Sequence, residues 1–426
     1  MTLANLQVTE RGSVPNALGV PGGDTGELPV PRQIEGRDLD RLRRYREYLD
    51  YYEGRRGAPP ANRRERVLSF NYARAIVEKG ASYLVSDHRP VVTPVDDSEE
   101  ARRSAAAAER ALQQVWEDND LAHLDLETEI DTAVLGDGAF KVVWDDRERR
   151  VVVSAPDVQG LHAWWVGDDV RRLWRVASRY ELAPDEFEQR HGQVLRARAG
   201  RRPSSVEVVE AWTAERFDLW VQGDLLESRA NPYGALPYVL YPNVPRPKQL
   251  WGLSDVEPLR ESLAELNRAL TQLSRILELS GNPIAVLENV EEARDIAVQP
   301  GAVWEVPEQA RAYLLDLLQG GGVRLHVEYV DLVYRTLHDL AETPRVAFGD
   351  SGGDRSGVAL QTELDPLLRK VQRKRLVRTA ALRQRDRLIL RVLEHHTGQR
   401  FQGVRTDIAW GPIFPRDSGM LVWGME

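Results

Sequence analysis

The stretch 254-SDVEPLRESLAELNRALTQLSRILELSG-281 predicts one long helix, and the rest of the fold follows from it. Ser254 and Glu257 have the spacing of a capping box, and Gly281 followed by Asn282-Pro283 supplies a stop. At 1.5 Å per residue the helix would be roughly 40 Å long. Its apolar residues alternate spacings of three and four, which makes one seam: Val256, Leu259, Leu263, Leu266, Leu270, Leu273 and Leu277.

Two more long helices are expected after this helix. A mixed segment at 284–318 contains short strand-like runs, and Gly320-Gly321-Gly322 then opens a helix at 323–342 that Pro344 ends. A last helix covers about 358–397, and Pro366 would bend or restart it near its beginning. Residues 343–357 join these two helices and contain four glycines.

The first 250 residues predict an α+β region. Residues 1–30 lack a sustained period and are expected to form a flexible arm. The prolines of 231–249 leave room only for short edge strands. Helical patterns cover 38–54, about 70–86, 99–116 and 121–135, and strand patterns cover 136–145, 149–156, 172–182 and 205–222.

Composition narrows the class of protein. The 426 residues are 42% apolar and 29% charged, with a formal net charge of -9, which argues against a surface that binds nucleic acid everywhere. No run of about 18 apolar residues could span a membrane, and no secretion signal opens the chain. The absence of cysteine excludes disulfides and thiolate metal sites.

Charge is segregated along the chain. Residues 282–342 hold eleven acidic and four basic side chains, whereas residues 369–391 hold ten basic side chains and one acidic one. The basic residues of this last helix, among them Arg373, Lys374 and Arg378, form either a solvated face or a contact with DNA phosphate or with acidic surfaces of neighbouring subunits.

Signs of an enzyme are weak. The chain has no P-loop, no HExxH and no EF-hand loop, so no cofactor and no metal site is predicted. The run 349-GDSGG-353 matches a nucleophile elbow around Ser351, but a helix rather than a strand precedes it. The acidic doublets 145-DD-146, 168-DD-169 and 291-EE-292 favour solvated turns and a helix start, and leave a metal-dependent nucleic-acid enzyme as an alternative. A helical scaffolding or adaptor protein without a channel is the other alternative.

Several short motifs, in order, resemble the portal proteins of tailed bacteriophages, specifically those of phages with long non-contractile tails. The similarity runs from about residue 40 to about 415. Its central pieces are 231-NPYGALP-237 and 252-GLSD-255, which opens the long helix containing Asn267. The other pieces are 51-YYEG-54, 71-NYARAIVEKGASYLVSDHRPVV-92, 133-AVLGDGAFKVVW-144 and 356-SGVAL-360.

The resemblance implies a mixed α/β portal fold, with an α+β wing and long stem helices, assembled as a ring-forming oligomer of typically twelve subunits. Such a ring is not an enzyme. It sits at one capsid vertex of the virion after assembly in the host cytoplasm. Double-stranded DNA passes through it, a separate terminase motor pumps that DNA, and the other implied partners are head-completion or adaptor proteins, the major capsid protein and scaffolding protein. No membrane is involved.

The resemblance also assigns parts. Residues 31–250 would be the wing, 251–281 and 323–342 the stem helices, 282–322 the clip, 343–357 the tunnel loop and 358–398 a long basic helix. Residues 399–426 would form a terminal wing strand and the start of a crown, which is either minimal or cut short.

The implied site residues fall into three groups. In the tunnel loop, Arg355 would contact phosphate, Asp350 and Asp354 would repel it and Phe348 would form an apolar tip, because DNA that must slide needs weak contacts and a loop freed by glycine. The remaining loop residues are Ser351, Gly352 and Gly353. The subunit-interface seam would be Leu259, Leu263, Leu266, Leu270, Leu273 and Leu277, and the clip would meet terminase through Glu288, Glu291, Glu292 and Arg294.

Overall fold

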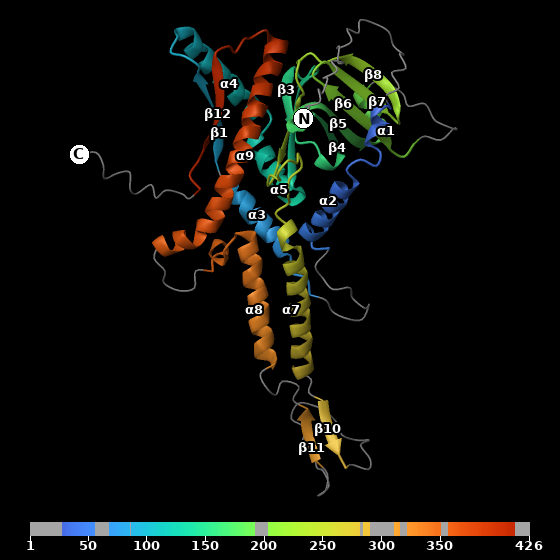
Figure 1. Cartoon of the computed structure of the whole chain (residues 1–426), viewed down its shortest axis with the longest axis vertical. Helices are drawn as coiled ribbons and strands as arrows, with labels where there is room; N and C mark the ends of the chain where they lie inside the picture. Colours follow the sequence, from blue (N-terminus) through green and yellow to red (C-terminus); the bar gives the residue numbers. More distant parts are fainter. Residues whose placement is uncertain are drawn as a thin grey trace, which may run out of the picture.

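A computed structural model describes residues 28–55, 68–85, 87–191, 203–281, 284–289, 311–315, 322–350 and 357–413. Figure 1 shows a body of helices and sheets from which two helices project side by side, with a β-hairpin beyond their far ends. The projecting helices are α7 (Arg260–Gly281) and α8 (Gly322–Ala341), and the hairpin pairs β10 (Ile284–Glu288) with β11 (Arg311–Leu315). We call α7 and α8 together the rod. The predicted mixture of helix and sheet is confirmed.

One side of the body is an antiparallel sheet of five consecutive strands. Alternation along β6 explains its two covered faces. Val206, Val208 and Trp212 enter the main apolar core, whereas Val209 and Ala211 lie under the short helix α1. The elements are β4 (Leu161–Val166), β5 (Asp169–Leu182), β6 (Val206–Thr213), β7 (Arg216–Val221), β8 (Asp224–Ala230) and α1 (Val30–Ile34).

A second sheet has the order β3-β2-β9 and lies beside the long helix α9. It follows α5 directly, because Gly136 ends that helix with φ of +99° and lets the chain turn into β2. A Cβ at Gly136 would lie 2.8 Å from the backbone nitrogen of Ser254, so a larger residue would push away the base of the rod. The elements are α5 (Leu121–Leu135), β2 (Asp137–Asp145), β3 (Arg150–Ser154), β9 (Tyr238–Pro242) and α9 (Gly357–Thr397).

Helix α9 crosses the body from the rod to its far end. Figure 1 shows that α9 changes direction close to its beginning, and Pro366 lies in that part of the helix. It packs against β2, β9 and the two-stranded sheet of β1 (His88–Pro94) and β12 (Val404–Trp410). The remaining elements are α2 (Leu39–Tyr52), α3 (Tyr72–Leu84), α4 (Glu99–Asp118), α6 (Pro184–His191) and the 3-10 turns η1 (Val158–Gly160), η2 (Glu257–Leu259) and η3 (Arg345–Phe348).

Several expectations need correction. Val30, the last residue of the arm predicted at 1–30, already belongs to α1, and residues 1–27 lie outside the described residues, so the arm stays a prediction. No strand is predicted from the sequence for β1, whose partner β12 lies more than 300 residues away in the chain. The prediction that Ser254 and Glu257 form a capping box is wrong. Glu257 accepts a hydrogen bond from the Tyr48 hydroxyl at 2.5 Å, and α7 begins only at Arg260, after the η2 turn.

The upper part of the leucine seam packs within one chain, so Leu259, Leu263 and Leu266 are not free for the predicted contact between subunits, whereas the assignment of Leu270, Leu273 and Leu277 to that contact stays a prediction. Leu259, Leu263 and Leu266 are at most 3% exposed, in a cluster with side chains of α3 and α8. Leu270 lies at the edge of this cluster. Burial then declines towards the far end of the rod, where Leu273 is half-buried and Leu277 is 53% exposed.

No helix in the described part of the chain is both long enough and apolar enough to cross a membrane.

Truncating the seam should therefore affect the two ends of α7 differently. Leu266→Ala is expected to lower the free energy of unfolding by about 2–5 kcal/mol, since it removes a buried side chain and leaves a cavity. The matched variant Leu277→Ala removes the same atoms from an exposed site and should cost less than about 1 kcal/mol. Urea unfolding of the two variants measures the difference. Equal losses would contradict the intrachain packing.

Candidate functional site

Three of the ten basic residues in the α9 stripe are buried in the body instead of facing solvent. Lys374, Arg378 and Arg385 are 6%, 4% and 0% exposed. Each meets a buried carboxylate from another element, and we call these three pairs the ion-pair ladder. The pairs join α9 to the base of the rod, to α5 and, through α5, to β1.

The first rung holds the base of the rod. The Lys374 ammonium lies 2.7 Å from Asp255 Oδ2, and the Lys370 ammonium lies 3.4 Å from the same oxygen. Burial alone would raise the pKa of Asp255, but Lys370 and Lys374 hold that pKa well below its usual range. Asn243 also donates to Asp255 at 2.9 Å. Because Asp255 lies just before η2 and α7, this cluster attaches the rod to α9.

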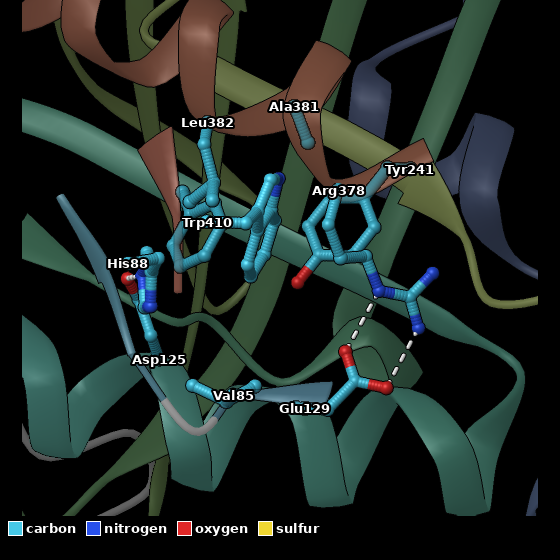
Figure 2. A pocket seen from close by; sticks show the side chains of 10 residues that line it. Val85, His88, Asp125, Glu129, Tyr241, Arg378, Ala381, Leu382 and Trp410 are labelled. Carbon is cyan, nitrogen blue, oxygen red and sulfur yellow. Dashed lines mark hydrogen bonds and ion pairs between the residues drawn. The ribbon is translucent and has the colours of Figure 1, made fainter. Parts of the chain in front are cut away.

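The second rung is a bidentate pair. Arg378 donates from Nε and Nη2 to the two oxygens of Glu129 on α5, at 2.7 and 2.9 Å, and Figure 2 shows both bonds. Its other donors reach Asn243 Oδ1 at 2.7 Å and the carbonyls of Pro242 and Asn243 at 3.1 and 3.0 Å. A buried guanidinium with this many partners is fully engaged in structure.

The third rung is a chain of three groups. Arg385 donates from Nη1 to Asp125 on α5, and Asp125 Oδ2 lies 2.7 Å from His88 Nε2 on β1. The imidazole of His88 stacks on Trp410 with 5.1 Å between ring centroids. Burial would raise the pKa of Asp125, but Arg385 and His88 lower it overall. The rung thus connects α9, α5 and the β1–β12 pair.

A small cavity lies beside the ladder. It has a volume of about 20 Å³ and is lined by His88, Asp125, Glu129, Arg378 and Tyr241 together with apolar side chains (Figure 2). This volume suits a single water molecule and is far below that of a ligand pocket. The ladder is therefore not a substrate site.

The expectation for the basic residues is thus corrected for two of the three. Lys374 and Arg378 are buried in ion pairs, so neither can reach DNA or another subunit. Arg373 is exposed, and its guanidinium donates to both oxygens of Glu342, at 2.7 and 2.6 Å. Arg369, Arg387 and Arg391 also remain on the solvent side of α9.

A signal for the ladder was present in the sequence. Lys374, Arg378 and Arg385 continue the spacing of three and four residues set by the buried Leu367 and Val371 on the same helix. A basic residue at an apolar position predicts a buried partner. The identity of that partner could not be read, since Asp125, Glu129 and Asp255 lie more than 100 residues away.

Only two of the seven loop residues can be placed. Phe348 belongs to η3, where its ring makes an edge contact with His338 at 5.5 Å and Lys79 lies over it at the same distance. Instead of forming a free tip, it packs against its own chain and is 38% exposed. Asp350 pairs with Arg345 at 2.5 Å. Ser351, Gly352, Gly353, Asp354 and Arg355 lie outside the described residues.

The clip residues are described only in part. Glu288 ends β10 at the far end of the rod, opposite Arg311 of β11, and accepts a hydrogen bond from the Tyr313 hydroxyl at 3.1 Å. Glu291, Glu292 and Arg294 lie outside the described residues.

The acidic doublets behave as turns where they are described. Asp145 accepts the backbone N–H groups of Arg147 and Glu148, at 2.7 and 3.1 Å, and Asp169 accepts that of Arg171 at 3.0 Å. Within the described ranges, no three His, Asp or Glu side chains are arranged to hold a metal ion. Before Ser351 the chain forms the η3 turn and not the strand that a nucleophile elbow needs. These positions give the enzyme alternative no support.

Asp386, which follows Arg385 on α9, is a buried carboxylic acid without a close cationic partner among the described residues. It is 1% exposed, its Oδ1 lies 3.9 Å from Arg385 Nε, and its Oδ2 has no hydrogen-bond partner among the described residues. Burial raises the pKa of Asp386 to about 7. Arg385 opposes this rise, and the like charge of Asp125 adds to it.

The ladder should matter for folding rather than for DNA binding. Arg378→Met removes the bidentate partner of the buried Glu129 and leaves it only the Lys374 ammonium, at 3.5 Å, so we expect it to lower the free energy of unfolding by about 3–5 kcal/mol. The exposed Arg373→Met should cost at most about 1 kcal/mol. Chemical unfolding of both variants provides the measurement. A stable Arg378→Met protein with weakened DNA binding would refute the structural role.

The protonation of Asp386 should make stability depend on pH. The folded carboxyl keeps its proton up to about pH 7, whereas an unfolded aspartate loses it near pH 4. Its contribution to stability is therefore complete below about pH 4 and is lost as pH rises to about 7. Asp386→Asn should be more stable than the natural protein at about pH 8, and this advantage should shrink towards pH 4.

Urea unfolding across that pH range measures this advantage. The matched control is Asp365→Asn, which changes an exposed pair with Arg369 on the same helix and should show no such trend. An advantage of Asp386→Asn that is constant with pH would rule out the buried proton.

Comparison with known protein families gives a match over nearly the whole chain. A family model described as phage portal protein, SPP1 Gp6-like, matches residues 32–422, which is nearly the full length and includes the body, the rod and the ladder. A search of curated proteins finds no match. The family match agrees with the ordered motifs around the rod base, and the chain belongs to the SPP1 Gp6-like family of phage portal proteins.

Proposed function

We propose that this portal protein forms a closed ring of typically twelve copies at one capsid vertex, with a central channel that double-stranded DNA crosses during packaging and ejection. Portal proteins form a structural family that acts in the capsid as an oligomer and associates with terminase. The observation that carries the finer proposal is the rod: a narrow two-helix arm that leaves the body and ends in a hairpin (Figure 1).

Each part of the chain has a role in this proposal. The body and β12 form the wing, the rod forms the stem, and residues 282–322 form the clip, where terminase and later the adaptor proteins dock. Residues 343–357 form the tunnel loop between α8 and α9. The wing faces the major capsid and scaffolding proteins, and assembly takes place in the host cytoplasm.

Charge supports a channel that does not hold its DNA tightly. Each lasting contact between a cation and a phosphate would be a barrier to sliding, because DNA binding is dominated by such contacts. Residues 282–342 are strongly acidic, and the ion-pair ladder pairs three basic side chains of α9 with carboxylates inside the body. Arg355 is the proposed phosphate contact of the loop, and the neighbouring Asp350 and Asp354 limit its strength.

Electron microscopy of the purified natural protein tests the ring. The expected images are closed rings with an open axial hole. Particles that stay monomeric under all conditions, including with scaffolding protein, would contradict the proposal, and compact assemblies without a hole would favour an adaptor. Within assembled rings, Arg355→Glu should leave assembly intact and reduce the amount of DNA packaged in an assay with terminase. Unchanged packaging would remove the loop from the mechanism.

A further inference from the structure

The rod exposes more apolar surface than a two-helix arm in water should leave uncovered. Of the side chains on α8, Leu325 is 69% exposed, Leu332 59%, Leu340 46% and Tyr329 40%. They follow one another at spacings of four, three and eight residues, so they form a single line along the helix. We call these four residues the α8 stripe. The stripe is separate from the inner face of α8, where Val330, Val333 and Leu337 meet the leucine seam.

The α8 stripe lies on one identifiable flank of the rod. The Tyr329 hydroxyl donates to Glu265 Oε1 on α7 at 2.7 Å, so this flank includes the Glu265 side of α7. The charged side chains of α8 lie on another face, where Arg324 pairs with Glu328 at 3.2 Å. Since these ion pairs are made within α8, the stripe itself is left to apolar contacts.

The opposite flank carries a second apolar patch. Val327 and Tyr334 each lie two residues after a stripe residue, and two residues turn a helix by about 200°, so both point away from the stripe. Tyr334 contacts Tyr72 at 5.2 Å between centroids, and Tyr72 contacts Phe70 at 6.5 Å. Phe70 is 44% exposed and Val327 49%. Phe70 also lies against α7, where its backbone N–H donates to Asn267 at 2.8 Å.

Two different apolar patches on opposite flanks favour a head-to-tail contact between copies over a two-fold dimer. A two-fold dimer needs one patch that fits itself, whereas a head-to-tail contact needs two unlike patches, and such contacts generate rings when the rotation closes. The exposed lower seam, with Leu277 at 53%, adds apolar surface nearer the far end of the rod. Exposed patches of this kind mark interfaces in soluble proteins.

We propose that the α8 stripe of one copy packs against the Phe70–Val327 flank of the next copy, and that this contact, rather than the leucine seam of α7, joins neighbouring rods. The inference rests on the proposed ring, and it identifies the second copy and the two faces that meet. It also explains how the seam can be buried within one chain while the rods of neighbouring copies still contact one another in a ring.

Charge introduced into the stripe tests the contact. Leu332→Glu should lower the fraction of subunits found in rings by at least roughly tenfold in native mass spectrometry, because a carboxylate would be buried without a partner. The matched variant Arg324→Glu places the same side chain on the charged face of α8 and should assemble like the natural protein. Thermal unfolding of the monomer should be nearly the same for both variants, since Leu332 is exposed within one chain.

The absence of cysteine in the natural chain allows a second test. The double variant Leu332→Cys with Val327→Cys, treated with a flexible bis-maleimide, should give a ladder of covalent oligomers on a denaturing gel. Each single variant should give mainly monomer, and a mixture of the two single variants should give dimers. Strong dimer formation by Leu332→Cys alone would show a two-fold contact and overturn the proposal.

The outcomes separate this inference from the ring itself. If the natural protein forms rings with an axial hole and Leu332→Glu still assembles, the ring stands and the assigned faces are wrong. If the natural protein never assembles, both are wrong. Rings that Leu332→Glu disrupts and Arg324→Glu does not, together with the cross-linking pattern above, would establish the contact.

Discussion

The ion-pair ladder between α9 and its neighbours is the interaction on which the rest of the structure depends. Lys374, Arg378 and Arg385 bring three cations into the body, and Asp255, Glu129 and Asp125 neutralise them there. Apolar packing alone tolerates small shifts between helices, whereas a bidentate pair such as Arg378 with Glu129 allows very few arrangements. A buried charge that loses its partner is costly, so the rungs specify how α5, α9 and the rod base meet.

The two ends of the rod differ in how completely their apolar side chains are buried. Its upper part is held by the ladder at Asp255 and by the buried end of the leucine seam, so its direction relative to the body is well defined. Its lower part consists of two helices that cannot bury their apolar side chains against each other alone. Stability near the body and incomplete burial far from it suit a subunit that becomes complete only beside its copies.

The distribution of basic and acidic residues suits the proposed passage of DNA. Three cations of α9 are paired within the body, and the segment that includes the rod's far end is acidic. A protein that must let a polyanion slide benefits from such an arrangement, because affinity for phosphate grows with each available cation. The exposed arginines of α9 remain, and Arg373 among them is already paired with Glu342.

By itself the sequence determined the regular elements and the family. The seam of α7, the helices α8 and α9, the strand β5, and β6 with β7 as one continuous run could be predicted, because local periodicity reflects which side of an element is buried. Ordered motifs around 252-GLSD-255 predicted the portal family, which the comparison confirmed. Only the tertiary structure decided which partner each side chain meets. The seam leucines turned inward to α8 and α3, β1 paired with β12, and Arg378 found Glu129, since these contacts join residues distant in sequence and one helix pattern is compatible with many neighbours.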